Sequence, residues 1–170
     1  VIQRAIELKE VIDDSRYHEL LTKLNITSDD LTRWKDISRR MYVPFLEDTK
    51  IIAQFDGYDQ LQEFDWEKYR ARHGEAMRLD RILESEGENV NKYKASKQAD
   101  VLMLFYLFSS EELLAIFKEL NYDFKSESIP ENIAYYEQRT SHGSTLSKIV
   151  HAWVLSRSDR KRSWVNFEMA

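Results

Sequence analysis

The apolar positions of the chain recur mostly with the period of an α-helix. Over residues 1 to about 23, apolar side chains fall near helical spacing with charges between them, at Ala5, Leu8, Val11, Ile12, Leu20 and Leu21. This pattern is typical of an amphipathic helix with one face on a core. Asn25 interrupts it, and Thr27 or Ser28 can cap a second helix that we expect to reach about Met41.

Residues 42–58 follow a different pattern. Pro44 interrupts helical spacing, residues 50–55 have a β-like composition, and Asp56-Gly57 is a turn signal. We therefore expect a short loop or hairpin here. Residues 60–84 return to helical spacing, with Gly74 as the expected break.

The later segment at about 95–108 is apolar on nearly every side, and the segment at about 144–156 is apolar on most sides. A helix of this kind is typically buried all round, and both segments are too short to cross a membrane. Amphipathic helices are expected at about 111–121, after a capping box at Ser109–Glu112, at about 130–138, and from about Ser158 onward.

Fully buried helices thus alternate with half-buried ones. The chain also has only four glycines and two prolines, so the sequence predicts an all-α fold. A double ring would explain the alternation, because inner helices are covered on both sides and outer helices on one. An irregular helical bundle is the alternative, and no fixed-period repeat supports a solenoid.

Composition narrows the possible partners. The 170 residues suit one domain or a piece of a larger one, with 42% hydrophobic and 32% charged residues and a net charge of −5. This balance gives no overall attraction to nucleic acid or to an anionic membrane. The chain has no cysteine, which excludes disulfides and thiolate metal sites and fits a cytoplasmic location.

The strongest candidate for chemistry is the segment Ser141–Ser147, a glycine flanked by hydroxyls just before a buried helix. The first amides of a helix lack internal partners and carry partial positive charge. Gly143 allows close approach to the backbone, and Ser141, His142, Ser144 and Thr145 offer side-chain donors. The segment therefore predicts an anion site suited to phosphate, and an ordinary N-cap is the alternative.

A second candidate is Lys97-Gln98, which we place in the first turn of the other buried helix. A lysine there does not complement the helix dipole, so it can instead contact a sugar hydroxyl or an anionic ligand, with Asp100 as a possible partner. The alternative is a lysine whose stem lies along the rim of the core.

Other patterns point to no site. The histidines lack metal-ligand spacing, and neither a Walker A loop nor a dinucleotide fingerprint is present, so we expect neither a metal nor a cofactor. The carboxylates at Glu84, Glu86 and Glu88 and at Asp56 are typical of solvated loops and turns. The basic run Arg157–Arg162 indicates a solvated face, with an RNA patch as the alternative.

Four segments together resemble glycoside hydrolase family 65, a family of maltose, trehalose, kojibiose and nigerose phosphorylases with some hydrolases. The segments, in matching order, are Trp34–Ile37, Ile51–Tyr58, Tyr93–Leu104 and Thr140–Ser147. The resemblance covers nearly the whole chain, and the last two segments are quite specific.

The resemblance implies a fold, a reaction and site residues. The fold is an (α/α)6 barrel, and the reaction is inverting phosphorolysis of an α-linked glucose disaccharide, of trehalose or maltose type, to β-glucose 1-phosphate. Ser141, His142, Gly143, Ser144 and Thr145 match the family's phosphate-binding motif, and Lys97 and Gln98 match the pair that contacts the transferred glucose. Inorganic phosphate is then the co-substrate. A hydrolase of the same family and a non-catalytic helical scaffold are the alternative functions.

The family's general acid lies in a Gly-Pro-Asp-Glu-Tyr type motif that this chain lacks. The chain also begins at Val1 and ends at Ala170 inside helical patterns. We therefore expect residues 1–170 to be an excised C-terminal part of the barrel, incomplete and inactive alone. We also expect the parent protein to be a homodimer.

Overall fold

A computed structural model describes residues 2–74, 77–143 and 145–170. The described residues are helical, without a strand of regular sheet, so the predicted all-α class is confirmed. The chain divides into two compact units, residues 1–42 with 115–123 and residues 43–114 with 124–170. In chain order the helices are α1 (Ile2–Glu7), η1 (Leu8–Glu10), α2 (Asp14–Lys23), α3 (Ser28–Arg39), η2 (Tyr58–Gln60), α4 (Trp66–His73), α5 (Leu79–Ser85), η3 (Val90–Lys92), α6 (Asp100–Leu107), α7 (Ser110–Glu119), α8 (Ser128–Gln138), α9 (Thr145–Leu155) and α10 (Arg160–Glu168).

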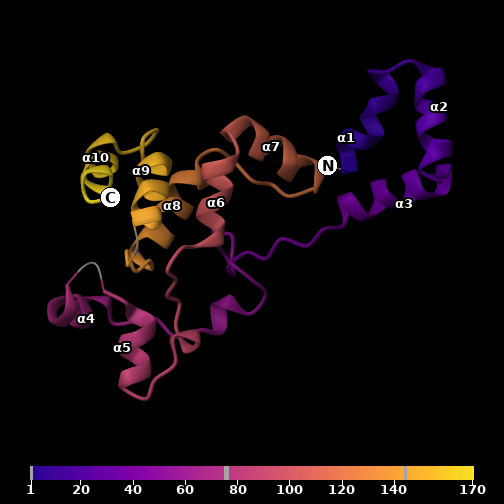
Figure 1. Ribbon diagram of the computed structural model, residues 1–170. Helices are drawn as coiled ribbons and strands as arrows, with labels where there is room; N and C mark the ends of the chain where they lie inside the picture. Colours follow the sequence, from indigo (N-terminus) through magenta and orange to yellow (C-terminus); the bar gives the residue numbers. More distant parts are fainter. Residues whose placement is uncertain (1, 75–76, 144) are drawn as a thin grey trace. The chain divides into compact units, whose positions relative to one another are not determined.

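The first unit contains α1, α2 and α3, of which α1 packs against α3. Figure 1 shows α1 and α2 side by side. The single helix predicted over residues 1–23 is wrong. The chain breaks before α2 because the carboxylate of Asp13 accepts a hydrogen bond from the amide of Ser15 and caps a new helix. The cap predicted for α3 is confirmed as a capping box between Thr27 and Asp30.

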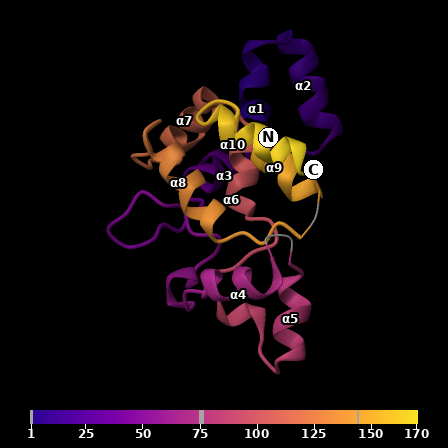
Figure 2. The ribbon, with the colours of Figure 1, turned by 90° about the vertical axis from the view of Figure 1, so that its left-hand side faces the viewer.

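The second unit is built around α9, which packs against α6, α8 and α10 (Figures 1 and 2). The inner face of α9 is buried, with Val150, His151, Val154 and Leu155 nearly inaccessible to solvent. The capping box before α7 is confirmed, since the Glu112 amide donates to Ser109 Oγ and the Ser109 amide to Glu112 Oε2.

The prediction that α9 is buried on every side is wrong. Leu146, Ile149 and Trp153 are about half exposed, and they lie on one side of the helix. Ile149 and Trp153 of α9 line an apolar groove together with Trp164 and Phe167 of α10. Helices α6, α8 and α10 pack against α9, and α10 also contributes side chains to this groove. The apolar composition of a helix shows how much of its surface can be buried. Packing against neighbouring helices decides how much of that surface is buried.

Asn132 of α8 ties this helix to the loop predicted at residues 42–58. Its side-chain oxygen accepts from the amide of Ile52 at 2.8 Å, and its nitrogen donates to the carbonyls of Lys50 and Ser128. The loop itself turns back through an antiparallel bridge between Phe45 and Ile52, as expected for a hairpin. One buried amide thus satisfies backbone groups that the loop leaves unpaired.

The region predicted as helical over residues 60–84 holds α4 and α5, separated by Gly74 in the left-handed region at φ 79°. Residues before α4 are extended, since Gln62 forms a parallel bridge with Tyr93. An aromatic cluster joins these segments, and Phe64 lies at its centre with rings of Trp66, Tyr69 and Tyr93 around it. This cluster anchors the chain immediately before the candidate residues Lys97 and Gln98.

Replacing Asn132 with Ala should destabilise the protein. The substitution leaves the Ile52 amide and the Lys50 carbonyl without their partner, at a cost of about 2–3 kcal/mol. Urea denaturation measures this loss, with the exposed neighbour Glu131→Ala as the control, expected to stay within about 0.5 kcal/mol. Equal stability of the two variants would contradict the role given to Asn132.

Candidate functional site

The two candidate segments lie side by side. Ser96 and Thr140 form a parallel bridge, in which the Ser96 amide donates to the Arg139 carbonyl at 2.9 Å and the Ser141 amide donates to the Ser96 carbonyl at 2.8 Å. The side chain of Arg139 adds a bidentate ion pair with Glu63, at 3.1 and 3.2 Å. Segments 44 residues apart in the sequence are therefore held together by backbone hydrogen bonds.

Lys97 and Gln98 occupy an extended stretch before α6, not its first turn. The helix begins at Asp100, and Ala99 before it has an extended backbone. The predicted helix start at residue 95 is wrong because residues 93–96 pair with Gln62 on one side and Thr140 on the other. Lys97 is exposed. The side-chain nitrogen of Gln98 donates to the sulfur of Met103 at 2.7 Å, and the side-chain oxygen of Gln98 remains an acceptor.

Ser141 is nearly buried, and its two donors are already engaged. Its amide binds Ser96, and its hydroxyl donates to the carbonyl of Met77 at 2.7 Å. A contact from Ser141 to phosphate would therefore have to replace one of these bonds. In this structure the residue fixes the loop against the segment that leads into α5.

Gly143 lies against the same carbonyl. A Cβ atom at this position would stand 3.0 Å from the Met77 oxygen, closer than packed atoms normally approach, and the Gly143 amide donates to the Ser141 carbonyl at 2.8 Å. Close packing of the backbone therefore favours glycine here, because a side chain would push against the Met77 carbonyl.

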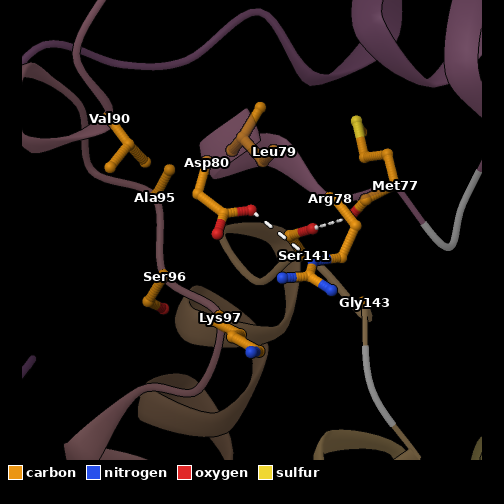
Figure 3. A pocket seen from close by; sticks show the side chains of 10 residues that line it. All are labelled: Met77, Arg78, Leu79, Asp80, Val90, Ala95, Ser96, Lys97, Ser141 and Gly143. Carbon is orange, nitrogen blue, oxygen red and sulfur yellow. Dashed lines mark hydrogen bonds and ion pairs between the residues drawn. The ribbon is translucent and has the colours of Figure 1, made fainter. Parts of the chain in front are cut away.

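Ser141 and Gly143 line a pocket of about 160 Å³ together with Arg78 and Lys97 (Figure 3). Figure 3 shows these side chains around the pocket, with the Arg78–Asp80 ion pair as a dashed line. Arg78 has Asp80 as an ion-pair partner at 3.8 Å, and both side chains of that pair are about half exposed. We call the pocket that Ser141, Gly143, Arg78 and Lys97 line the Gly143 pocket. Two cations beside a bent backbone segment make it suited to an anion or a sugar hydroxyl.

His142 points elsewhere, into a second pocket of about 320 Å³ that Arg70, Lys148 and Arg162 also line. We call this the His142 pocket. The ring Nδ1 lies 3.3 Å from the hydroxyl of Ser147, which is fully buried on α9. Consecutive residues of one motif thus serve two different pockets, an arrangement that the sequence did not indicate.

The pKa of His142 is lowered from 6.5 to about 4. Burial is the main cause, because a charged imidazole loses hydration there, and repulsion from His151, Lys148 and Arg70 lowers the pKa further. The ring is therefore neutral at physiological pH, with one nitrogen as a donor and the other as an acceptor.

Behind His142 lies a buried polar array. The rings of His142 and His151 meet edge to face at 4.6 Å, and Nδ1 of His151 lies 3.8 Å from a carboxylate oxygen of Glu137. Glu137 is nearly buried and pairs with Arg162 at 2.5 Å. Arg162 belongs to the run predicted as a solvated face, so sequence reasoning missed this pairing. The sequence carried one signal for the buried polar array behind His142, because Ser147 and His151 are four residues apart and lie on one face of a helix.

The remaining predicted residues stand at the start of α9. Thr145 is its first residue and is exposed, whereas Ser144 lies outside the described residues. Within the described ranges, no group of three or more His, Asp and Glu side chains is arranged to hold a metal ion. None of the described helices is both long and apolar enough to cross a membrane.

Comparisons with known proteins agree on one family. Residues 1–169 match the model of the glycosyl hydrolase family 65 central catalytic domain. An uncharacterized glycosyl hydrolase of Mycobacterium tuberculosis is 49% identical over 98% of this chain and 12% of its own length. Trehalose 6-phosphate phosphorylase of Lactococcus lactis is 34% identical over 73% of this chain and 16% of its own, and kojibiose phosphorylase of Halothermothrix orenii is 33% identical over 89% and 18%.

A solved structure supports the same placement. The "putative kojibiose phosphorylase from human microbiome" matches 94% of this chain and 20% of its own, with a TM-score of 0.63 and 25% identity. With the helical architecture, this match confirms the predicted fold class, part of an (α/α)6 barrel. The chain spans less than a fifth of the length of each of the three curated relatives above.

Acid should destabilise the protein partly through His142. Between about pH 6.5 and 4, the unfolded chain binds a proton at this residue that the folded protein does not. The free energy of unfolding should therefore fall as pH is lowered through this range, by on the order of 1 kcal/mol after allowance for partial exposure. Denaturation at several pH values should show a weaker dependence in His142→Gln. The exposed His18→Gln is the control, and an unchanged pH dependence in His142→Gln would contradict the assignment.

Proposed function

The chain belongs to glycoside hydrolase family 65, and we propose that it supplies the phosphate-binding and glucose-binding parts of a disaccharide phosphorylase active site. The observation that carries this proposal is the bridge between Ser96 and Thr140, which places Lys97 and Gln98 beside the loop of Ser141, His142 and Gly143. A transferred glucose and an attacking phosphate must be neighbours, and the bridge makes the candidate residues for each into neighbours.

The proposed reaction is phosphorolysis with inversion at the anomeric carbon. An oxygen of phosphate forms a bond to the anomeric carbon of an α-linked glucose unit, and the glycosidic bond breaks. The products are β-glucose 1-phosphate and the acceptor sugar, whose oxygen takes a proton from a general acid. That acid is proposed to lie outside this chain, because no Gly-Pro-Asp-Glu-Tyr type motif occurs in it. On this proposal the 170 residues are inactive by themselves.

The cationic surroundings favour phosphate over water as the nucleophile. An inverting hydrolase needs a second carboxylate to activate water, whereas phosphate arrives as an anion and needs a site of positive charge. Both pockets of the loop contain cations, Arg78 and Lys97 in one and Arg70, Lys148 and Arg162 in the other. Hydrolysis by a member of the same family remains the second candidate, since the family contains glycosyl hydrolases by name.

The substrate is proposed to be an α-glucosidic disaccharide of trehalose or maltose type. Relatives of the chain bear the names of kojibiose, nigerose and trehalose 6-phosphate phosphorylases. The proposed function needs inorganic phosphate as co-substrate and no cofactor, and the proposed setting is a cytoplasmic homodimer.

The enzyme should release glucose 1-phosphate only when phosphate is supplied. The full-length protein is incubated with trehalose, maltose, kojibiose and nigerose, with and without inorganic phosphate, and the anomer of the product is identified by NMR. Phosphate-dependent formation of the β-anomer from at least one sugar is expected. Equal turnover without phosphate would support the hydrolase instead.

Lys97→Met should lower turnover in that assay by about 10²- to 10³-fold, as expected when one group that stabilises charge in the transition state is removed. Lys92→Met is the matched control, because Lys92 is an exposed lysine paired with Glu88. Unchanged turnover in Lys97→Met would contradict the proposed glucose contact and favour a scaffold role for this segment.

A further inference from the structure

Two chain segments of the candidate site converge on the carboxylate of Glu63. Its two oxygens accept from Nε and Nη2 of Arg139 at 3.1 and 3.2 Å. One of these oxygens also lies 3.4 Å from the ammonium of Lys94. Lys94 stands three residues before Lys97, and Arg139 stands two residues before Ser141. One side chain therefore binds both segments that carry the candidate site residues.

The two cations are better shielded from solvent than the carboxylate. The side chains of Lys94 and Arg139 are 15% and 18% exposed, whereas that of Glu63 is 54% exposed. Arg139 is also held independently of Glu63, because its Nη1 donates to the carbonyl of Tyr135 at 3.0 Å and its guanidinium lies 3.7 Å from the ring centre of Tyr135. Without the carboxylate, two largely buried like charges would stand close together, and their repulsion would act between the two segments.

The backbone contacts between these segments are short. The segment 93–96 forms one bridge with Gln62 and another with Thr140, and both are isolated bridges outside any named strand. The amide of Lys94 donates to the carbonyl of Gln62 at 2.8 Å, so the chain next to Glu63 is joined to this segment by its backbone as well. An isolated bridge has few neighbouring hydrogen bonds and opens locally at low cost. A side-chain ion pair can therefore decide how firmly the segments stay in register.

We propose that Glu63 is a positioning residue, which holds the segment of Lys97 and Gln98 in register with the loop 141–143. This inference rests on the proposed function, in which the first segment contacts the sugar and the loop contacts the attacking phosphate. On this proposal Glu63 contacts neither ligand and acts through its two cationic partners. Because the reaction needs both ligands in mutual alignment, a shift of either segment slows it.

The effect of this ion pair is local. An exposed ion pair adds little to global stability, and Glu63 is half exposed. The bidentate geometry with Arg139 and the shared contact with Lys94 nevertheless favour one relative position of the two segments. Removing the charge should therefore loosen the contact between the segments while the helices of the protein stay folded.

The first test is amide hydrogen exchange of the full-length protein, measured by mass spectrometry. Glu63→Gln keeps the size of the side chain and removes its charge. We expect peptides that contain the amides of Ser96 and Ser141, which donate across the bridge, to exchange about fivefold faster. Amides within α9 should exchange as in the wild type. Glu19→Gln is the matched control, since it removes the charge of another exposed ion pair and should change neither.

The second test is turnover of the same variants with disaccharide and phosphate. Glu63→Gln should lower kcat by about 10-fold and leave the KM of the disaccharide within about twofold, since misalignment acts on the transition state. The melting temperature should fall by less than about 3 °C, which separates misalignment from loss of folded protein. Glu63→Asp restores the charge and should recover part of the lost turnover.

The proposal is overturned if Glu63→Gln leaves exchange at Ser96 and Ser141 unchanged, or if its kcat stays within about twofold of the wild type. A loss of kcat that matches a loss of folded protein would also overturn it. If Glu63→Gln does not fold, Lys94→Met replaces it, because this variant removes one cation and keeps the carboxylate paired. Faster exchange at Ser96 is again expected, and unchanged exchange would overturn the proposal.

The two proposals fail separately. A wild type whose turnover does not need phosphate would reject the phosphorylase, and exchange at Ser96 and Ser141 would still decide whether Glu63 holds the two segments together. Phosphate-dependent turnover in the wild type, with unchanged exchange and kcat in Glu63→Gln, would keep the proposed function and reject the positioning role.

Discussion

Two backbone hydrogen bonds, from Ser96 to Arg139 and from Ser141 to Ser96, are the constraint on which the candidate site depends. They join an extended segment before α6 to the loop before α9, and neither segment has regular structure of its own to hold it. The Ser141 hydroxyl and the close packing of Gly143 then fix the loop to the carbonyl of Met77. The positions of Lys97 and His142 follow from these contacts, so the site is built from the backbone outward.

Local chemistry allowed much of the fold to be predicted. The capping box at Ser109 forms as predicted, and the cap predicted at Thr27 or Ser28 forms at Thr27, where it is also a capping box. Pairing between segments that are distant in the sequence could not be predicted in the same way. The apolar run suggested a helix from residue 95. In the structure the first part of this run is extended, because it pairs with Gln62 and Thr140. Nothing in the local sequence of residues 93–99 carries information about those distant partners.

The candidate site shows the same division. The motif at residues 141–145 predicts an anion site, and the pocket that His142 lines also includes residues far from it in the sequence, Arg70 on α4 and Arg162 on α10. Glu137 of α8 and His151 of α9 form a buried contact. Arg162 pairs with Glu137 but lies within a run of basic residues, so the sequence does not single it out. Sequence spacing reports contacts within one helix, such as Ser147 with His151, and is silent on contacts between helices.

The proposed function requires that residues 96–98 and the loop of Ser141, His142 and Gly143 together bind sugar and phosphate. Amide chemical shifts of the labelled protein during titration with inorganic phosphate test it most directly. We expect shifts concentrated at Gly143, Thr145 and Lys97, on both sides of the bridge. Saturable shifts confined to surfaces away from both segments, or no shifts at any phosphate concentration, would contradict it.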